Sequence, residues 1–222
     1  MDEVALAARI DHTLLDAAAT ARDIDRLCRE AVELGFAAVC VMPAWVSRCV
    51  ACLGGDGVSV CTVAGFPLGA HLTEVKALEA RRAVEQGARE VDMVIALGPL
   101  KDGRHAMVAR DIAGVVAAAA SAIVKVILET SRLSNEEKIA GARIAMEAGA
   151  AFVKTSSGFA GGATVEDVRL LREIVGPEFG VKASGGIRTR GQALALLAAG
   201  ASRLGTSSGV AIVRGARAAD TA

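Results

Sequence analysis

The 222-residue sequence contains no tyrosine and a single tryptophan, and it has no excess of charge of either sign. Its 25 basic and 25 acidic residues cancel, so the overall charge does not indicate binding to nucleic acid or to an anionic membrane. No stretch free of charged residues reaches the roughly 20 apolar residues that a membrane-spanning helix needs. The N-terminus has no basic region or signal core. We therefore expect a soluble, cytoplasmic protein without a nucleic-acid or membrane partner.

Cysteine and histidine are also scarce, and their spacing does not predict a metal site. The five cysteines are an odd number in a chain long enough to fold without disulfides, so free thiols are expected. Cys49 and Cys52 have the spacing of half a zinc site or of a redox pair, but no matching second pair follows, which favours two cysteines on one helix. The three histidines lie far apart. Neither a G-x-G-x-x-G nor a Walker motif occurs, so no nucleotide cofactor is expected.

A repeated glycine signal predicts the fold. Gly35, Gly87, Gly149 and Gly200 each end a predicted helix and precede an apolar strand. They lie 52, 62 and 51 residues apart, about twice the length of one βα unit, which predicts eight units. Capping boxes are expected at Thr20, Ser134, Thr164 and Thr189, followed by Asp23, Glu137, Asp167 and Gln192. Strands are expected at 10–12, 37–42, 58–64, 90–95, 123–129, 151–154, 180–183 and 203–206.

Eight alternating units favour a closed (β/α)8 TIM barrel that forms one domain over residues 1–222. Residues 2–9 would add an extra N-terminal helix. A doubly wound open sheet is the alternative, but it needs edge strands, and none of these strands is polar enough to be one.

Two lysines mark the ends of neighbouring predicted strands. Lys154 follows the apolar run 150–153, and Lys182 follows Val181 one βα unit later. Ligand sites lie at the carboxyl ends of strands in such folds, where a desolvated amine can become neutral and attack carbonyls. A lone lysine there more often extends its charge to solvent. A second lysine nearby disfavours one of the two charges, so the pair indicates an activated amine.

Acidic residues interrupt other predicted strands. Asp92 lies within the apolar run 90–95, Asp11 lies in the first strand, and Lys125 lies in the fifth. For Asp92 alone, a structural ion pair with Lys125 is as good an interpretation as catalysis. Because charged residues of matching parity occur on several strands, we expect a polar cluster at the barrel axis, which is typical of an active site.

Glycine and serine dominate the loops after the last two strands, 184–188 and 205–209, and each loop opens a helix. Glycines allow backbone N–H groups to approach an anion, and helix N-termini add partial positive charge, so a phosphate site is predicted here. The alternative interpretation is that both segments are only tight βα turns.

Seven segments together resemble the 2-deoxyribose-5-phosphate aldolase family, class I aldolases of (β/α)8 fold that form a Schiff base. The resemblance spans about residues 10–209. It rests on Asp11-His-Thr-Leu-Leu15, Val39-Cys-Val-Met-Pro43, Gly65-Phe-Pro-Leu-Gly69 with Thr73-Glu-Val-Lys76, Glu90-Val-Asp-Met-Val-Ile95, Lys125-Val-Ile-Leu-Glu-Thr130, Phe152 to Phe159 and Val181 to Arg188.

The resemblance implies cleavage of 2-deoxy-D-ribose 5-phosphate to D-glyceraldehyde 3-phosphate and acetaldehyde, with no cofactor. Lys154 would form the imine, and Asp92 and Lys182 would move protons through a bound water, while Lys182 also favours the neutral amine of Lys154. Gly185, Gly186, Ser207 and Ser208 match the phosphate-binding turns, and Asp11 and Cys40 match other positions that line the site. The partners would be small sugar phosphates and aldehydes, and the assembly a homodimer or homotetramer.

Three positions depart from the family pattern. Ser157 stands where threonine is usual, and Ala96 where asparagine is common. The tail from Arg214 lacks the terminal tyrosine that some members use in proton transfer, which puts the rate of that step in doubt. Two other functions stay open at this point: a class I aldolase of another sugar phosphate, and a sugar-phosphate-binding barrel that has lost catalysis.

Overall fold

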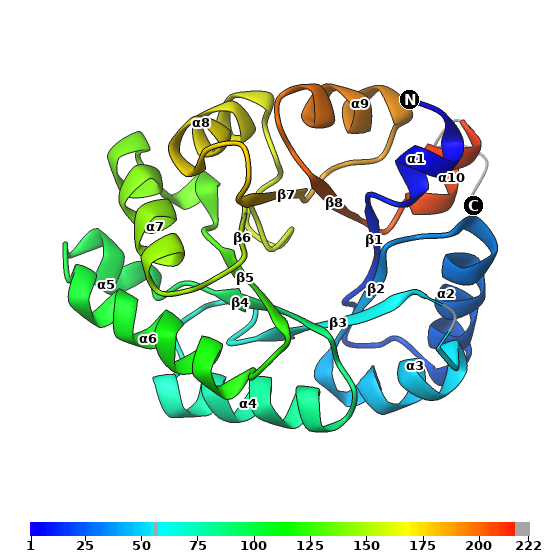
Figure 1. The fold of residues 1–222 in the computed structure, drawn as a ribbon, viewed down its shortest axis with the longest axis horizontal. Coiled ribbons are helices and arrows are strands. Elements are labelled where there is room, and N and C mark those ends of the chain that lie inside the picture. The colour runs from blue at the N-terminus through cyan, green and yellow to red at the C-terminus, as the bar shows by residue number, and fades with distance from the viewer. Residues whose placement is uncertain (56, 216–222) are drawn as a thin grey trace.

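Eight parallel strands close into a barrel in the computed structural model, which describes residues 1–55 and 57–215 (Figure 1). Each strand pairs with the next in sequence, and the last pairs with the first, where Leu204 lies opposite Ile10. The closed barrel confirms the predicted (β/α)8 fold over the described residues and excludes the open doubly wound sheet. The strands are β1 (Ile10–Leu14), β2 (Ala38–Val41), β3 (Ser59–Ala64), β4 (Glu90–Val94), β5 (Ile123–Ile127), β6 (Phe152–Lys154), β7 (Gly180–Ser184) and β8 (Arg203–Thr206).

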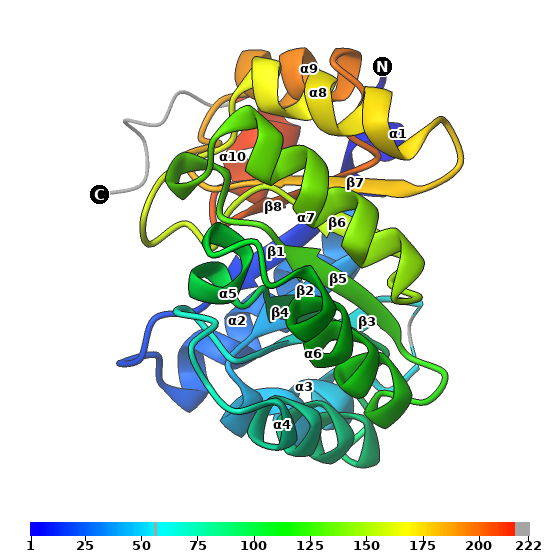
Figure 2. The same cartoon turned by 90° about the vertical axis from the view of Figure 1, so that its left-hand side faces the viewer.

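Helices surround the strands on the outside of the barrel (Figure 2). The predicted N-terminal helix is present as α1 (Glu3–Ala7) and packs against the last helix, α10 (Gly209–Arg214). None of the helices in the described ranges is long and apolar enough to cross a membrane. The others are α2 (Ala21–Leu34), α3 (Val46–Leu53), α4 (Thr73–Glu85), α5 (Leu97–Lys101), α6 (His105–Ala118), α7 (Asn135–Glu147), α8 (Val165–Val175) and α9 (Arg190–Ala198), with 3-10 turns η1 (Pro43–Trp45) and η2 (Thr130–Arg132).

Local capping chemistry fixes where most of the long helices begin. Thr20, Ser134 and Thr189 form the predicted capping boxes. The box predicted at Thr164 is wrong in one half, because Thr164 accepts from the Asp167 backbone but the Asp167 carboxylate pairs with Lys138 instead, at 2.7 Å. The Asp167 carboxylate, which would complete the capping box, bonds instead to the ammonium group of Lys138 on α7.

The predicted strand 123–129 is too long. β5 ends at Ile127, not at Glu129, because Glu129 has a left-handed backbone conformation with φ 58° and ψ 59°. The 3-10 turn η2 begins directly after it, at Thr130. A residue in this conformation cannot continue a strand, so the charged group that the pattern placed in the strand lies in the loop above the barrel.

The free state of the cysteines agrees with the sequence. All five are free thiols, as predicted. Cys49 and Cys52 lie together on α3, which confirms the prediction of two cysteines on one helix. Cys40 and Cys61 lie on β2 and β3 in a small apolar cluster with Ala38 and Val63.

A buried ion pair joins α4 to α6. Lys76 is fully buried, and its Nζ donates to Asp111 Oδ2 at 2.7 Å and to the carbonyl oxygen of Val94 at 3.0 Å. Thr73 Oγ1 donates to the other oxygen of Asp111 at 2.9 Å. The pair therefore ties the outer helices to the carboxyl end of β4, the strand that carries Asp92.

We expect Lys76→Met to lower the free energy of unfolding by about 3–5 kcal/mol, because it leaves the Asp111 carboxylate buried without its cation. Urea denaturation measures the loss. The double variant Lys76→Met/Asp111→Leu should recover much of it, because it removes both charges together. Equal stability of the single variant and the wild type would contradict the role of this pair.

Candidate active site

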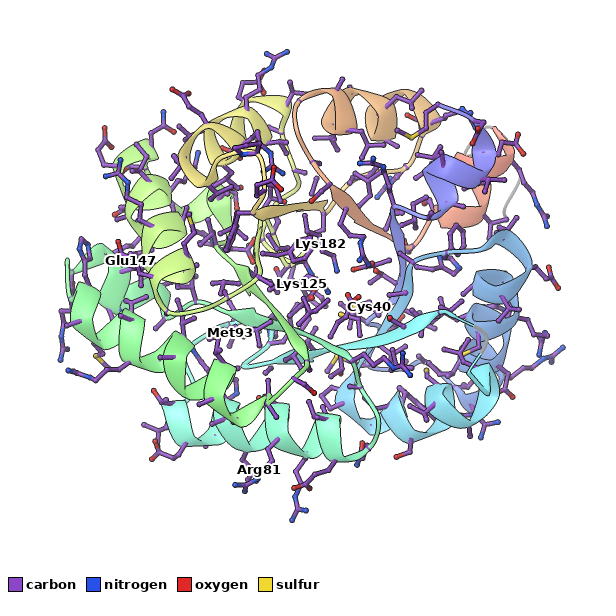
Figure 3. All side chains as sticks on the ribbon, in the orientation of Figure 1. Cys40, Arg81, Met93, Lys125, Glu147 and Lys182 are labelled. Atoms are coloured by element: carbon purple, nitrogen blue, oxygen red, sulfur yellow. The ribbon has the colours of Figure 1, made fainter. Side chains whose placement is uncertain are left out.

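Charged side chains fill the inside of the barrel at the level of β4 to β7. The register places Asp92 beside Lys125 and Lys154 beside Lys182. Each of the four residues is exposed by 2% or less. Figure 3 shows Lys125 and Lys182 near the barrel axis together with Cys40. The alternate residues of these strands, such as Met93, pack in the hydrophobic core instead. The polar cluster predicted from parity is thus confirmed.

Asp92 is the centre of this cluster. Its Oδ2 accepts from the Nζ atoms of Lys154 and Lys182, each at 2.7 Å. Its Oδ1 accepts from Lys125 Nζ at 2.8 Å and from the Cys61 thiol at 3.2 Å. The ion pair with Lys125, which was the structural interpretation of Asp92 in the sequence, is present, and Asp92 also contacts the two strand-end amines.

A second tier of charges lies beside Asp92. Asp11 pairs with Lys182 and accepts from Arg203 Nη1 at 2.5 Å. Glu90 Oε2 lies 2.5 Å from Lys125 Nζ, and Glu90 Oε1 lies 3.5 Å from Arg203. Three carboxylates therefore meet four basic side chains when Lys154 is included. Because unbalanced buried charge is costly, one neutral amine would bring the cluster to balance.

The environment fixes the charge state of most of this cluster. Burial alone would raise the pKa of Asp92, but the charges of Lys125, Lys154 and Lys182 hold it well below its usual value. Burial likewise opposes the ammonium form of Lys182, yet Asp11 and Asp92 raise its pKa above that of a free lysine. Burial also opposes the ammonium form of Lys125, but the charge of Asp92 and of its neighbours raises the pKa of Lys125 well above that of a free lysine. At neutral pH, Asp92 is therefore a carboxylate, and Lys125 and Lys182 are ammonium groups.

A cavity of about 800 Å³ opens above the cluster, at the carboxyl ends of the strands. Of the three lysines bonded to Asp92, Lys154 lines this cavity, while Lys125 and Lys182 lie beneath it. Lys154 is therefore the lysine of this cluster that a molecule in the cavity could reach. The walls are formed by the carboxyl ends of strands and by the segments that follow β1, β2, β3, β6, β7 and β8, and they include Thr13, Leu14, Met42, Phe66, Ser157, Phe159, Ser184, Arg188 and Thr206.

The two predicted phosphate turns differ in their relation to this cavity. Gly185, Gly186 and Ser207 line it, but Ser208 does not. Gly185 and Gly186 have φ of 89° and 74°, which glycine adopts readily. The Ser208 N–H donates to Thr206 Oγ1 at 2.9 Å, so this amide is already bonded within the turn. The geometry favours Gly185, Gly186 and Ser207 over Ser208 as contacts for a ligand.

Asp11 and Cys40 are close to the site but do not line the cavity. Both are fully buried, Asp11 in the second tier with Lys182 and Arg203, and Cys40 on β2 beside Cys61. A hydrogen bond from Cys61 lowers the pKa of Cys40. Neither side chain lines the cavity, so each could act on a ligand only through its neighbours.

Two groups of potential metal ligands occur among the described residues, and both lie inside the charged cluster: Cys40, Cys61 and Asp92, and Asp11, Cys61 and Glu90. The carboxylates of both groups already pair with lysine or arginine. A metal cation would have to displace these ammonium and guanidinium groups. The donors therefore fit a lysine cluster better than a metal, and the absence of a metal requirement stays a prediction.

Sequence reasoning missed several groups at the site. Arg188 lines the cavity beside the Gly185–Gly186 turn and supplies a positive charge there. Its position at the end of the Ser-Gly-Gly-Ile-Arg segment was the available signal. Phe66 and Phe159 meet edge to face across the cavity wall, with ring centroids 5.3 Å apart. No periodic pattern predicts that contact, because the two residues lie on loops far apart in the sequence.

The comparison with known proteins decides the family. Residues 5–216 match the sequence profile of the DeoC/LacD family aldolase. The chain belongs to the DeoC/LacD aldolase family. Deoxyribose-phosphate aldolase of Geobacillus sp. is 56% identical over 212 residues, with 95% of each chain covered. That of Thermococcus gammatolerans is 58% identical over 220 residues, with 97% of this chain and 98% of the relative covered.

A solved structure supports the same assignment for this DeoC/LacD aldolase. The deoxyribose phosphate aldolase from Aeropyrum pernix, described as a unique tetrameric structure, superposes with a TM-score of 0.90 at 37% identity. The alignment covers 96% of this chain and 91% of that chain. The resemblance stated from the motifs is thus confirmed. Ala96 and Ser157, two of the three positions that depart from the family pattern, are among the described residues. The tail beyond residue 215 lies outside them.

Proposed function

We propose that this DeoC/LacD aldolase reversibly cleaves 2-deoxy-D-ribose 5-phosphate to D-glyceraldehyde 3-phosphate and acetaldehyde through a Schiff base on Lys154. The observation that carries the proposal is the position of the Lys154 amine, which bonds to Asp92 at 2.7 Å and faces the cavity while Lys182 lies beneath it. The identity of 54–58% to deoxyribose-phosphate aldolases supports the choice of substrate.

The proposed cleavage begins when the neutral amine of Lys154 adds to the aldehyde carbon C1 of the open-chain sugar and water leaves. The resulting protonated imine accepts the electron pair of the C2–C3 bond when the C3 hydroxyl loses its proton. That bond breaks, glyceraldehyde 3-phosphate departs, and an enamine remains on Lys154. Protonation of the enamine at C2 and addition of water release acetaldehyde and regenerate the amine.

Asp92 and Lys182 are suited to the proton movements in this scheme. The Asp92 carboxylate is positioned beside the Lys154 nitrogen, so it can stabilise the positive charge of the imine and accept a proton. Lys182 shares Oδ2 of Asp92 and is held as an ammonium group, so it can supply a proton to the same carboxylate. Asp11 and Cys40 support these groups from the buried layer below.

The phosphate group would bind between the turns after β7 and β8. Gly185, Gly186 and Ser207 offer backbone and hydroxyl donors on this side of the cavity, and Arg188 adds a positive charge. Ser208 would contribute to phosphate binding as part of the second turn, although its amide bonds to Thr206.

Ser207→Glu should raise KM for 2-deoxyribose 5-phosphate about tenfold or more, because the added carboxylate repels the phosphate dianion. Ser207 is exposed, so the substitution should not disturb folding. Unphosphorylated 2-deoxyribose, which lacks that charge, should be little affected. Ser207→Gln is the neutral control of similar size. Equal losses with both sugars would show that the phosphate binds elsewhere.

Reductive trapping tests the proposed function. Acetaldehyde and borohydride added together should leave one ethyl group per chain, and peptide mapping should locate it on Lys154. A product assay with a panel of sugar phosphates separates this reaction from a class I aldolase of another substrate. A protein that traps no aldehyde would be a binding barrel without catalysis. Both assays should succeed after exhaustive chelation, and a loss of activity that zinc restores would contradict the Schiff-base mechanism.

We also propose a domain organisation, an assembly and a location for the protein. Residues 1–222 would act as one domain, because every described strand belongs to the same barrel. A homodimer or homotetramer is proposed by analogy with the tetrameric Aeropyrum pernix relative, and sedimentation velocity measures it. The five free thiols support a cytoplasmic location.

A further inference from the structure

Glu129 combines burial with an uncommon backbone conformation at the edge of the active site. The residue is 2% exposed and lies two positions after the end of β5. Its φ of 58° makes it one of two non-glycine residues with positive φ among the described residues, the other being Ala120. Such a conformation is unfavourable for a residue with a side chain and persists only where the surroundings compensate for it.

The carboxylate of Glu129 is bonded to a single residue of the loop that follows Lys154. The Ser157 N–H lies 3.3 Å from each carboxylate oxygen, and the Ser157 hydroxyl donates to Oε2 in a very short hydrogen bond. Ser157 Oγ also accepts from the N–H of Phe159 at 3.1 Å. No basic side chain in the described part of the chain pairs with Glu129. Among the described residues, the side chain of Glu129 therefore bonds only to Ser157.

This loop, residues 157–163, packs directly on the turn proposed to bind phosphate. The N–H of Ala163 donates to the carbonyl oxygen of Gly185 at 3.0 Å. A Cβ atom at Gly185 would lie 2.7 Å from the carbonyl oxygen of Gly161, and one at Gly162 would lie 2.8 Å from that of Gly185. The two backbones touch without room for side chains. Any shift of the loop therefore shifts the turn.

The same loop also forms part of the cavity wall. Ser157, Gly158 and Phe159 line the cavity together with Lys154 and the adjoining Gly185 and Gly186. Lys154 itself is held separately, because its carbonyl accepts from Leu128 N at 2.9 Å and its amine bonds to Asp92. Lys154 therefore has backbone and side-chain contacts of its own, in addition to the contact between Glu129 and Ser157.

We propose that Glu129 is a positioning residue that acts through Ser157 to hold the loop 157–163 against the Gly185–Gly186 turn, and so sets the affinity for the phosphorylated substrate. The inference rests on the proposed function, because it assigns the phosphate to that turn. It separates two properties of the site: Glu129 controls how tightly the sugar phosphate binds, and the charged cluster controls imine formation.

Glu129→Gln tests the proposal, because the amide keeps the size of the side chain but replaces one acceptor oxygen with a donor that clashes with the Ser157 donors. We expect KM for 2-deoxyribose 5-phosphate to rise about tenfold, since a buried donor loses its acceptor. Trapping of acetaldehyde on Lys154 should keep its wild-type rate. Amide hydrogen exchange at residues 157–163 should become faster, and this readout does not require activity.

Matched variants make the result specific. Glu147→Gln makes the same chemical change at the C-terminal end of α7, far from the barrel axis in Figure 3. This control variant should change neither KM nor loop exchange. Ser157→Ala should show the same rise in KM and the same faster loop exchange, and it tests the proposal even if Glu129→Gln folds poorly. Ser157→Thr keeps the hydroxyl and should stay near the wild type. The double variant Glu129→Gln/Ser157→Ala should be no worse than either single variant.

The outcomes distinguish this inference from the proposed function. Unchanged loop exchange in Glu129→Gln and Ser157→Ala would overturn the positioning role. A loss of acetaldehyde trapping equal to the loss of sugar-phosphate affinity would overturn it too, because Glu129 would then act on Lys154. If the wild type cleaves no sugar phosphate, the proposed function fails, while the exchange experiment still reports whether Glu129 holds the loop.

Discussion

Lys154→Met should lower kcat/KM for 2-deoxyribose 5-phosphate by a factor on the order of 10⁴ or more, because the variant has no amine with which to form the imine. Reductive trapping of acetaldehyde should disappear at the same time. No other amine replaces it at the cavity floor, since Lys125 and Lys182 lie below and are held as ammonium groups by Asp92 and its neighbours.

The same variant should fold as well as the wild type. Methionine has a similar length, and the loss of Lys154 leaves three carboxylates, Asp11, Glu90 and Asp92, with three basic partners. The buried charges are then equal in number, so the thermal midpoint should stay within a few degrees of the wild type. Trapping that continues in Lys154→Met, with the adduct on Lys182, would show that the roles of the two lysines are reversed.

The central part of this site could be predicted from local sequence pattern. A charged residue inside an apolar strand must face the barrel axis or be paired, and the period of two places Asp92, Lys125 and Lys182 on the same side. The strand ends are fixed by hydrophobic runs that stop at Lys154 and Ser184. Parity and strand order therefore predict which charges meet, without knowledge of any distance.

The depth of each residue in the barrel could not be predicted in this way. Asp11 and Cys40 have the correct parity, but the tilt and stagger of the strands place them below the cavity floor. Ser208 follows its strand by two residues, as a ligand contact should, yet its amide is taken by Thr206. The vertical order of side chains depends on the shear of the closed barrel, which no local pattern encodes.

Glu129 shows a second limit of local pattern. Its spacing from Lys125 and Ile127 matches a strand, so the period of two extends β5 through it. The left-handed backbone that ends the strand is compensated by Ser157, which lies 28 residues later in the sequence. A contact of that separation becomes visible only when β5 and β6 are side by side.

The second large effect concerns Lys182, whose ammonium group shares Oδ2 of Asp92 with the amine of Lys154. Burial opposes the charged form of Lys182, but Asp11 and Asp92 raise its pKa, so the group stays positive near neutral pH. A positive neighbour disfavours a second ammonium group on Lys154. Removal of that neighbour therefore removes a charge that opposes a second ammonium group beside Asp92.

Lys182→Met should therefore shift the pH profile of acetaldehyde trapping upward, and it should lower turnover by about 10²–10⁴-fold because a proton donor is lost. Trapping is the decisive measurement, since it follows the amine of Lys154 without requiring the later proton transfers. Lys182→Arg is the matched control, because it keeps the positive charge beside Asp92 and should leave the trapping profile near that of the wild type. An unshifted profile in Lys182→Met would mean that burial alone, and not the neighbouring charge, keeps the Lys154 amine reactive.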